Sequence, residues 1–321
     1  SAGALLSLAW PDRIARWRGQ GGAFQLSSGR GAVLDEAEPL ARNPFIVVAD
    51  LQGAAASARI LSAAAIGMDE IEALHGASIQ AKREAFLDPQ SGRVRAKVSR
   101  RLGALALGEA PAELAPKDAA QEIIVSHLRR NGLAALDWGK SAARLRDRLA
   151  FLNAHDPAWP DVSDAALCAS LDDWLLPFLA NPRALADITP QILREGLEYC
   201  VTLAGKTIAG ADRLAPEHFH TPAGSHVPIR YEGKAAFLAV RVQELFGLKS
   251  HPAVMDGGVA LTLELLSPAH RPIQVTQDLP GFWKGSWAAV RSEMRGRYPR
   301  HPWPEDPAGA APTSRAKPRG T

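Results

Sequence analysis

The chain has 321 residues, of which 46% are apolar and 22% are charged, close to the composition of ordinary globular proteins. Its formal net charge is only +3, so the chain as a whole is not a polycation. A surface for nucleic acid would therefore have to come from local clusters of lysine and arginine. The length suggests two or three domains.

Two cysteines, Cys168 and Cys200, are too few for a disulfide framework, and we interpret them as small core residues in a reducing compartment. No run of residues approaches the roughly 18 apolar residues of a membrane helix. We therefore expect a cytoplasmic protein without a membrane partner. The chain starts at Ser1, inside an apolar helical pattern, which indicates a fragment of a longer protein.

The first third of the chain predicts a small β-barrel. Residues 2–9 resemble the end of a helix, and "PDRIARWR" predicts a second helix, because Pro11 suits the first helical position and Asp12 the first turn. The pattern then changes to period two, interrupted by one predicted helix at 68–76. Strands are expected within 22–35, 44–53, 57–67, 78–87, 92–99 and 101–107. Such a run is typical of a five-stranded OB-type barrel, which we assign to residues 1–114.

The rest of the chain predicts helices followed by a mixed region. Residues 117–208 follow a helical period, while strands and helices alternate after residue 213, with one helix expected over 279–297. We assign residues 115–298 to a helical region plus a small mixed α/β C-terminal domain. Residues 299–321 form a basic, proline-rich tail that we expect to be extended or disordered. The fold class is therefore α+β.

Two motifs suggest catalytic sites, and each has a plainer interpretation. "GKT" at 205–207 resembles part of a phosphate loop, but Cys200 stands where that loop requires a glycine. We therefore expect no ATP site here. "PEHFHTPAGSH" places His218, His220 and His226 close together, and a zinc site needs three or four such ligands. A metal-dependent enzyme at this segment stays open as an alternative.

A basic segment at 82–101 is the main candidate for binding nucleic acid. In "GRVRAKVSRR" (92–101) cations alternate with small apolar residues, so a strand would present the cations on one face. We expect this face to lie on the barrel and to follow an RNA backbone. A solvated or edge strand is the alternative. The candidate residues are Lys82, Arg83, Arg93, Arg95, Lys97, Arg100 and Arg101.

The end of the chain repeats the combination of cations and aromatic rings. "MRGRYPRHPWPEDP" (294–307) contains Arg295 and Arg297, with Trp283, Trp287 and Trp303 nearby. Cations can bind phosphates and rings can stack on bases. The two tryptophans before the segment fall at helical spacing and are better explained as core residues. The segment would then be a strap over its domain, and we expect its two arginines to contribute less to RNA binding than the hairpin cations.

Two groups of sequence stretches resemble a known family. "WPDRIARWRG" with "FQLSSGRGAVL" and "FIVVADLQG" is similar to the OB-fold region of bacterial DEAH-box helicases of the HrpB type. "LTLELLSPAHRPIQVTQDLPGFWKGSW", "VRSEMRGRYPRHPWPEDP" and "PTSRAKPR" resemble the C-terminal domain of that family. The resemblance covers most of the chain.

The resemblance implies the non-motor C-terminal half of an ATP-dependent RNA helicase. The family's RecA-like motor domains would precede Ser1 and would hold ATP and Mg²⁺, so no catalytic residue and no cofactor is assigned to this chain. The implied partners are single-stranded RNA and the upstream motor. A protein–protein docking module that uses the aromatic strap is the alternative. The sequence leaves the oligomeric state and the RNA preference open.

Overall fold

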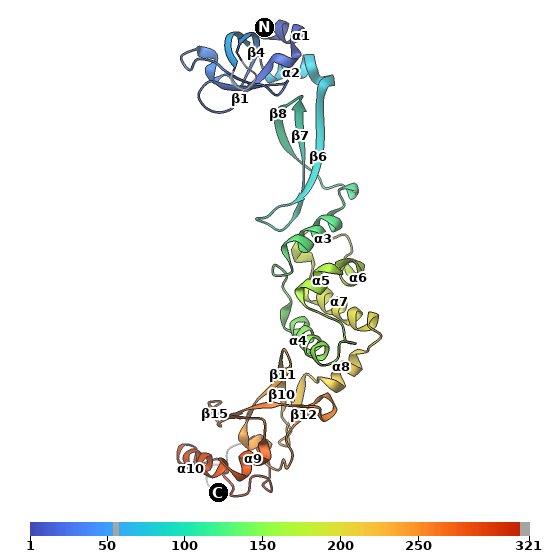
Figure 1. The fold of residues 1–321 in the computed structure, drawn as a ribbon, viewed down its shortest axis with the longest axis vertical. Coiled ribbons are helices and arrows are strands. Elements are labelled where there is room, and N and C mark those ends of the chain that lie inside the picture. Colours follow the sequence, from blue (N-terminus) through green and yellow to red (C-terminus); the bar gives the residue numbers. More distant parts are fainter. Residues whose placement is uncertain (54–57, 315–321) are drawn as a thin grey trace. The chain divides into compact units, whose positions relative to one another are not determined.

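The computed structural model describes residues 1–53 and 58–314. These residues form an α+β fold, as expected, with a closed barrel, a helical region and a C-terminal mixed sheet (Figure 1). The chain separates into two compact units, Ser1–Ile123 and Ile124–Thr321. The domain boundary expected at residue 114 stays a prediction.

The first unit begins with the expected five-stranded barrel. Its strands are hydrogen-bonded in the order β1-β2-β3-β5-β4, and β4 pairs with β1 to close the ring. Helices α1 (Ala2–Ala9) and α2 (Met68–His75) flank the barrel in sequence. The strands are β1 (Ile14–Trp17), β2 (Ala23–Leu26), β3 (Gly31–Val33), β4 (Phe45–Gln52) and β5 (Ala58–Ala65).

The prediction of a helix in "PDRIARWR" is wrong. Only Pro11–Arg13 form a short 3-10 turn, and the chain continues directly into β1. Ile14 and Ala15 are fully buried there, and the backbone of β1 pairs with β2 on one side and β4 on the other. Two strand partners and a buried apolar pair outweigh the local helix-start signal of proline and aspartate.

The expectation that the basic strands belong to the barrel is also wrong. Strands β6 (Ile79–Leu87), β7 (Val94–Leu102) and β8 (Leu105–Ala112) form a separate antiparallel sheet, visible as its own ribbon in Figure 1. The barrel already closes with β1 to β5, so it has no free edge with which these strands could pair.

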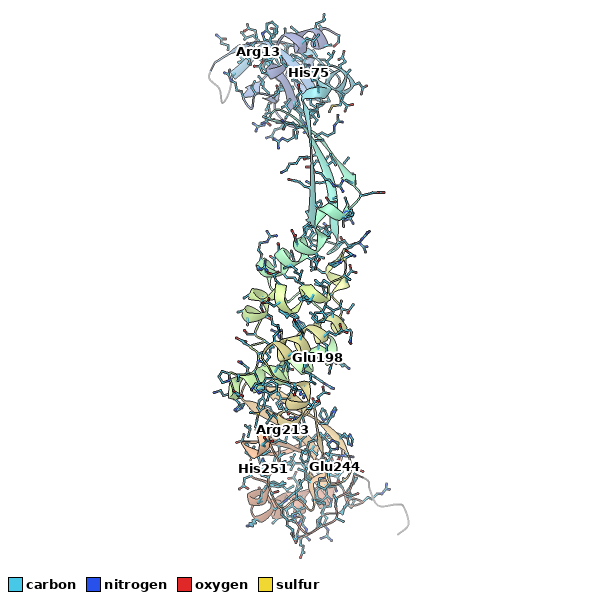
Figure 2. All side chains as sticks on the ribbon, turned by 90° about the vertical axis from the view of Figure 1, so that its right-hand side faces the viewer. Arg13, His75, Glu198, Arg213, Glu244 and His251 are labelled. Carbon is cyan, nitrogen blue, oxygen red and sulfur yellow. The ribbon has the colours of Figure 1, made fainter. Side chains whose placement is uncertain are left out.

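Two polar side chains connect the elements of this unit. Arg13 donates a hydrogen bond of 2.7 Å to the carbonyl of Ala49 and so fixes the 3-10 turn to β4. The Nε2 atom of His75 lies 2.9 Å from the hydroxyl of Ser7, which connects α2 to α1. Both Arg13 and His75 are labelled in Figure 2.

The second unit contains the predicted helical region. Helix α7 begins at a Thr189 cap whose hydroxyl accepts from the amide of Ile192, followed by proline at the first helical position. The helices are α3 (Ala120–Asn131, which crosses the boundary between the units), α4 (Gly139–His155), α5 (Asp164–Ala169), α6 (Leu171–Trp174), α7 (Pro190–Leu203) and α8 (Ile208–Leu214).

A five-stranded mixed sheet follows, in the order β15-β14-β11-β10-β9. Strands β11 and β14 are parallel, and the other neighbours are antiparallel. A separate pair, β12 (Ala253–Val254) and β13 (Val259–Ala260), lies between β11 and β14 in sequence. The strands of the sheet are β9 (His218–His220), β10 (His226–Glu232), β11 (Ala235–Arg241), β14 (Thr262–Leu266) and β15 (Pro272–Thr276).

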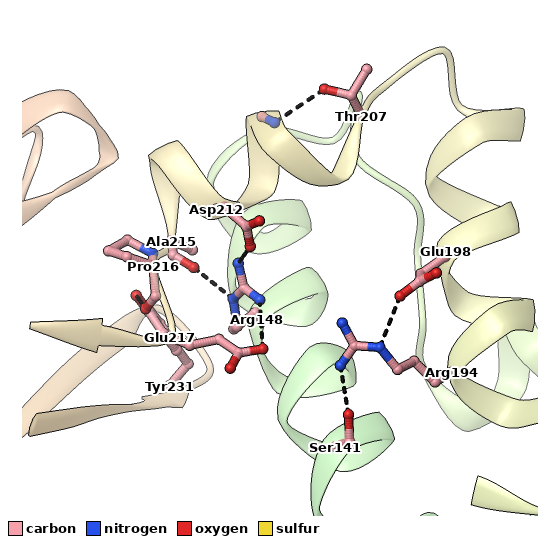
Figure 3. A network of polar contacts seen from close by, with 11 residues as sticks. Ser141, Arg148, Arg194, Glu198, Thr207, Asp212, Ala215, Pro216, Glu217 and Tyr231 are labelled. Carbon is pink, nitrogen blue, oxygen red and sulfur yellow. Dashed lines mark hydrogen bonds and ion pairs between the residues drawn. The ribbon is translucent and has the colours of Figure 1, made fainter. Parts of the chain in front are cut away.

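One buried guanidinium joins the helices to this sheet. Arg148, on α4, is 2% exposed and makes three hydrogen bonds with the segment that leads into β9 (Figure 3). It donates to the carbonyl of Ala215 at 2.6 Å, to Asp212 at 2.5 Å and to Glu217 at 3.2 Å. A buried charge is tolerated only with such partners, so the position of α4 against this segment is tightly defined.

The segment expected as one helix over 279–297 is two helices, α9 (Leu279–Lys284) and α10 (Trp287–Arg297). They are separated at Gly285, whose backbone leaves the helical region. Trp283 and Trp287 are buried, as the strap interpretation expected, and their rings meet edge to face with centroids 5.4 Å apart.

The tail is ordered as far as it is described. Trp303 is buried and donates to the carbonyl of Tyr298, while Gly247 donates to the carbonyl of Pro307. The backbone amide of Thr313 donates to the carbonyl of Gln243. Residues 299–314 are thus an irregular strap packed on their own domain, which agrees with the extended alternative for the tail and not with disorder. Residues 315–321 of the expected tail lie outside the described residues.

None of the helices in the described part of the chain combines the length and the apolar character that a bilayer span requires.

Replacing Trp287 with alanine should lower the free energy of unfolding of the second unit by about 3–5 kcal/mol, as for other buried aromatic residues. The indole is 2% exposed and donates to the carbonyl of Pro304, so its loss leaves a cavity and an unpaired carbonyl. Urea unfolding followed by circular dichroism measures the change. Val275→Ala is the control because Val275 is 63% exposed, and equal costs for both variants would contradict the buried position of Trp287.

Candidate nucleic-acid interface

The cations of the basic hairpin occupy two faces of their sheet. Alternation along β7 is confirmed, because Val94 and Ala96 are buried while Arg95 is exposed. Residues that pair across antiparallel strands share a face. The register therefore places Lys82, Arg95, Lys97 and Arg101 on one face and Arg83 and Arg100 on the other.

Most of these cations are already paired with carboxylates. Lys82 pairs with Glu84 at 2.6 Å, and this hydrogen bond lowers the pKa of the Glu84 carboxyl below its ordinary value. Several partners come from outside the hairpin. The remaining pairs are Arg83–Asp118, Arg95–Asp88, Lys97–Glu109 and Arg100–Glu72. Among the described residues no carboxylate pairs with Arg93 or Arg101, so the hairpin carries less free charge than its sequence suggests.

The two arginines near the end of the chain lie in the other unit. Arg295 and Arg297 belong to the last turn of α10, where cations favourably meet the negative helix end. Arg297 also pairs with Glu293 at 3.0 Å. The rings around them do not form an open stacking surface, because Trp287 and Trp303 are both buried.

A groove in the first unit collects arginines without carboxylates. It has a volume of about 380 Å³ and lies where β1 and β2 of the barrel meet the end of β7 and the start of β8. We call it the arginine groove, and its main side chains are Arg16, Trp17, Arg18, Gln25 and Arg101.

The strand register explains which side chains line this groove. Arg16 lies opposite Gln25, so these two side chains share the outer face of the barrel, and Arg18 has the same strand parity. Trp17 has the opposite parity, is half-buried and packs against the barrel core. Its indole Nε1 is buried and has no hydrogen-bond partner among the described residues.

The guanidinium groups of the groove are not neutralised. Arg16 donates to the carbonyl of Ala106, and Arg101 donates to the carbonyl of Ala104 at 3.1 Å. Within residues 1–53 and 58–314, the guanidinium of Arg18 has no hydrogen-bond or ion-pair partner. Three positive charges therefore line the groove and no acidic side chain does, an arrangement that attracts phosphate groups.

A shared apolar core fixes the third arginine beside the barrel. Leu102, Leu105 and Leu107 pack in one buried cluster with Ile14 and Val47 of the barrel strands. Since Arg101 is adjacent to Leu102, its backbone position is set by this cluster.

The turn between β7 and β8 rests directly on the barrel. The amide of Ala104 donates to the carbonyl of Ser27 at 2.8 Å. Gly103 has a φ of +56°, and a Cβ at this position would lie 2.4 Å from the Ser27 oxygen. Only glycine fits this contact, which holds one wall of the groove in place.

The sequence prediction included Arg101 but missed Arg16, Arg18 and Gln25. A signal was present, because "RIARWR" places Arg16 and Arg18 two residues apart on either side of Trp17. Interpreting this stretch as a helix concealed its period of two. Whether the nine predicted cations contact nucleic acid stays a prediction.

The structure does not assemble the alternative metal site. The rings of His220 and His226 face each other across β9 and β10, with centroids 4.1 Å apart. No group of three or more potential metal ligands from His, Cys, Asp and Glu forms in the described part of the chain. The histidine segment therefore lacks the three-ligand set that a catalytic zinc ion needs.

The "GKT" motif is a helix junction. Thr207 caps α8 by accepting from the amide of Gly210. Lys206 lies over the ring of Trp159 and pairs with Asp156 at 3.6 Å. These contacts give Lys206 and Thr207 structural roles that do not require a bound phosphate.

Comparison with known proteins gives a consistent result. The family model "ATP-dependent helicase C-terminal" matches residues 174–307. The ATP-dependent RNA helicase HrpB of Escherichia coli strain K12 is 39% identical over 324 aligned residues, which include 98% of this chain. This chain is homologous to the C-terminal portion of the HrpB helicases.

Two solved structures agree with this assignment. A crystal structure of the E. coli DExH-box NTPase HrpB matches 98% of the chain at 37% identity with a TM-score of 0.61. A second, of the Escherichia coli DEAH/RHA helicase HrpB, matches 94% at 34% identity with a TM-score of 0.52. The chain spans 39% of the length of the curated HrpB relative.

Replacing Gly103 with alanine should destabilise the first unit by at least about 1–2 kcal/mol, the cost of a left-handed backbone with a side chain. The close contact with Ser27 adds to this cost and should also move Arg101 away from the barrel. Thermal unfolding measures the effect. Gly108→Ala in β8 is the matched control, since its Cβ would meet no described atom within 4 Å. Equal melting temperatures for the two variants would argue against the docked turn.

Proposed function

We propose that this chain is the RNA-binding, non-motor part of an HrpB-type ATP-dependent RNA helicase, and that the arginine groove holds the backbone of single-stranded RNA. The observation that carries the proposal is the set of three arginines without carboxylate partners. The family relation supports a role in an RNA helicase, because the HrpB relative is described as an ATP-dependent RNA helicase.

The chemistry of the groove suits a single strand. Phosphate contacts supply most of the affinity of such complexes, and Arg16, Arg18 and Arg101 offer guanidinium groups for them. Gln25 adds an amide that can donate or accept a hydrogen bond. Arg93, which also lacks a carboxylate partner, would extend the contact along the hairpin.

The remaining parts of the reaction belong to other domains in this proposal. RecA-like motor domains would bind ATP and Mg²⁺ and would associate with this chain in the cytoplasm. The docking-module alternative is less favoured, because the strap uses Trp303 for its own packing and so does not offer this ring to a partner.

Wild-type chain should bind a labelled single-stranded RNA weakly and with a steep dependence on salt. If about six phosphates are neutralised, affinity should fall on the order of 10²–10³-fold between about 50 and 200 mM salt. Replacing Arg16, Arg18 and Arg101 with serine should reduce the slope of log K against log salt by about two units. Fluorescence anisotropy across a salt series measures both values.

A control variant removes the same number of cations from the hairpin. Lys82, Arg95 and Lys97 are all paired with carboxylates, so replacing them with serine should change the slope by less than about one unit. A groove variant that keeps the wild-type slope would show that this surface is merely solvated.

The chain by itself should not hydrolyse ATP. Lys206 and Thr207 are engaged in an ion pair and a helix cap, and no glycine-rich phosphate loop surrounds them. A phosphate-release assay with the purified chain and RNA should therefore show only background rates. RNA-stimulated hydrolysis that persists in Lys206→Ala would contradict the assignment of the motor to other domains.

A further inference from the structure

A second cavity lies entirely within the second unit, between helix α4 and strands β10 and β11. Its volume is about 320 Å³, at the small end of the range for ligand sites. Arg148 and Tyr231 belong to its lining, and both are buried. The hydroxyl of Tyr231 donates to the carbonyl of Pro216 at 2.7 Å, and the guanidinium of Arg148 is held by the three bonds in Figure 3. This part of the cavity is therefore rigid.

One part of the lining is a cation–π pair. The guanidinium carbon of Arg230 lies 4.8 Å from the centre of the Phe237 ring. Glu232 and Glu264 pair with the same guanidinium at 2.6 and 2.9 Å, so its charge is balanced and its movement is restricted. A fixed guanidinium or an aromatic face is a surface on which a nucleobase stacks.

Two side chains of α4 supply unpaired charges. Asp147 and Arg144 are three residues apart on this helix and line the cavity, and within the described ranges neither side chain has a hydrogen-bond or ion-pair partner. Burial raises the pKa of the Asp147 carboxyl above its ordinary value. A ligand that donates to Asp147 would relieve this cost.

We propose that this cavity binds a guanine nucleotide, with the base against the Arg230–Phe237 pair, its donor edge on Asp147 and its phosphate near Arg144. Guanine is favoured because its N1–H and N2–H groups are adjacent donors, which the two oxygens of one carboxylate accept together. Adenine, cytosine and uracil each place an acceptor beside their donor on this edge.

The first experiment measures binding of GMP, IMP and AMP to the whole chain by isothermal titration calorimetry. GMP should bind about tenfold more tightly than AMP, the effect of one good bidentate contact, and IMP should fall between them because it lacks the N2 amine. Asp147→Asn should bring GMP to the level of AMP. Asp147 is exposed to solvent on one side and has no partner to lose, so this variant should fold normally.

Two further variants separate the contacts. Arg230→Lys keeps the charge but removes the planar group, and should weaken all three nucleotides by a similar factor. Asp173→Asn is the matched control, because it removes an exposed carboxylate of α6 outside the cavity and should leave all affinities unchanged.

A third experiment, with RNA, distinguishes a base of RNA from a free nucleotide as the ligand. A ten-nucleotide uridine RNA with one central guanosine is compared with the all-uridine RNA by anisotropy at fixed salt. A gain from the guanosine that disappears in Asp147→Asn assigns the cavity to a base of RNA, whereas binding of GMP without such a gain assigns it to a free nucleotide.

This inference fails separately from the proposed function, because removal of the groove arginines leaves the cavity untouched. Equal affinities for GMP, IMP and AMP, or a GMP preference that survives Asp147→Asn, would overturn it and leave the cavity to a protein ligand.

Discussion

The closure of the barrel is the constraint on which the first unit depends. When β4 pairs with β1, all five strands have partners on both sides, and the sheet has no edge left to extend. The basic strands that follow must then form their own sheet. That sheet meets the barrel at its end, where Leu102, Leu105 and Leu107 enter a shared apolar cluster, and the arginine groove lies at this junction.

The distribution of carboxylates, more than the number of cations, decides where this unit can attract phosphate. Sheet formation brings Glu109 beside Lys97, and the preceding helix and following turn bring Glu72 to Arg100 and Asp118 to Arg83. No acid lines the groove. A cation-rich strand can thus be nearly balanced, while three scattered arginines form the more positive surface.

In the second unit one buried arginine has a comparable organising role. Arg148 fixes α4 against the segment that leads into β9, and the cavity between α4 and β10 follows from that arrangement. The strap follows the sheet in sequence. The Trp303 indole donates to the carbonyl of Tyr298, and the carbonyl of Pro307 accepts from the amide of Gly247, so the strap is bound to its own domain. The hydrogen bonds of Arg148 and those of the strap both give partners to backbone groups in irregular segments, which would otherwise remain unpaired.

The sequence by itself determined the α+β class, most strands and helices, the buried tryptophans and the relation to HrpB, because these depend on local period, composition and long motifs. It did not determine that "RIARWR" is a strand, since only pairing with both β2 and β4 outweighs the helix-start signal of Pro11. Nor did it determine the groove or the balanced hairpin. Arg16 and Arg101 are 85 positions apart in the chain, and Arg83 and Asp118 are 35 apart. Only the tertiary structure could therefore bring Arg16 and Arg101 into one groove and pair the charge of Arg83 with Asp118.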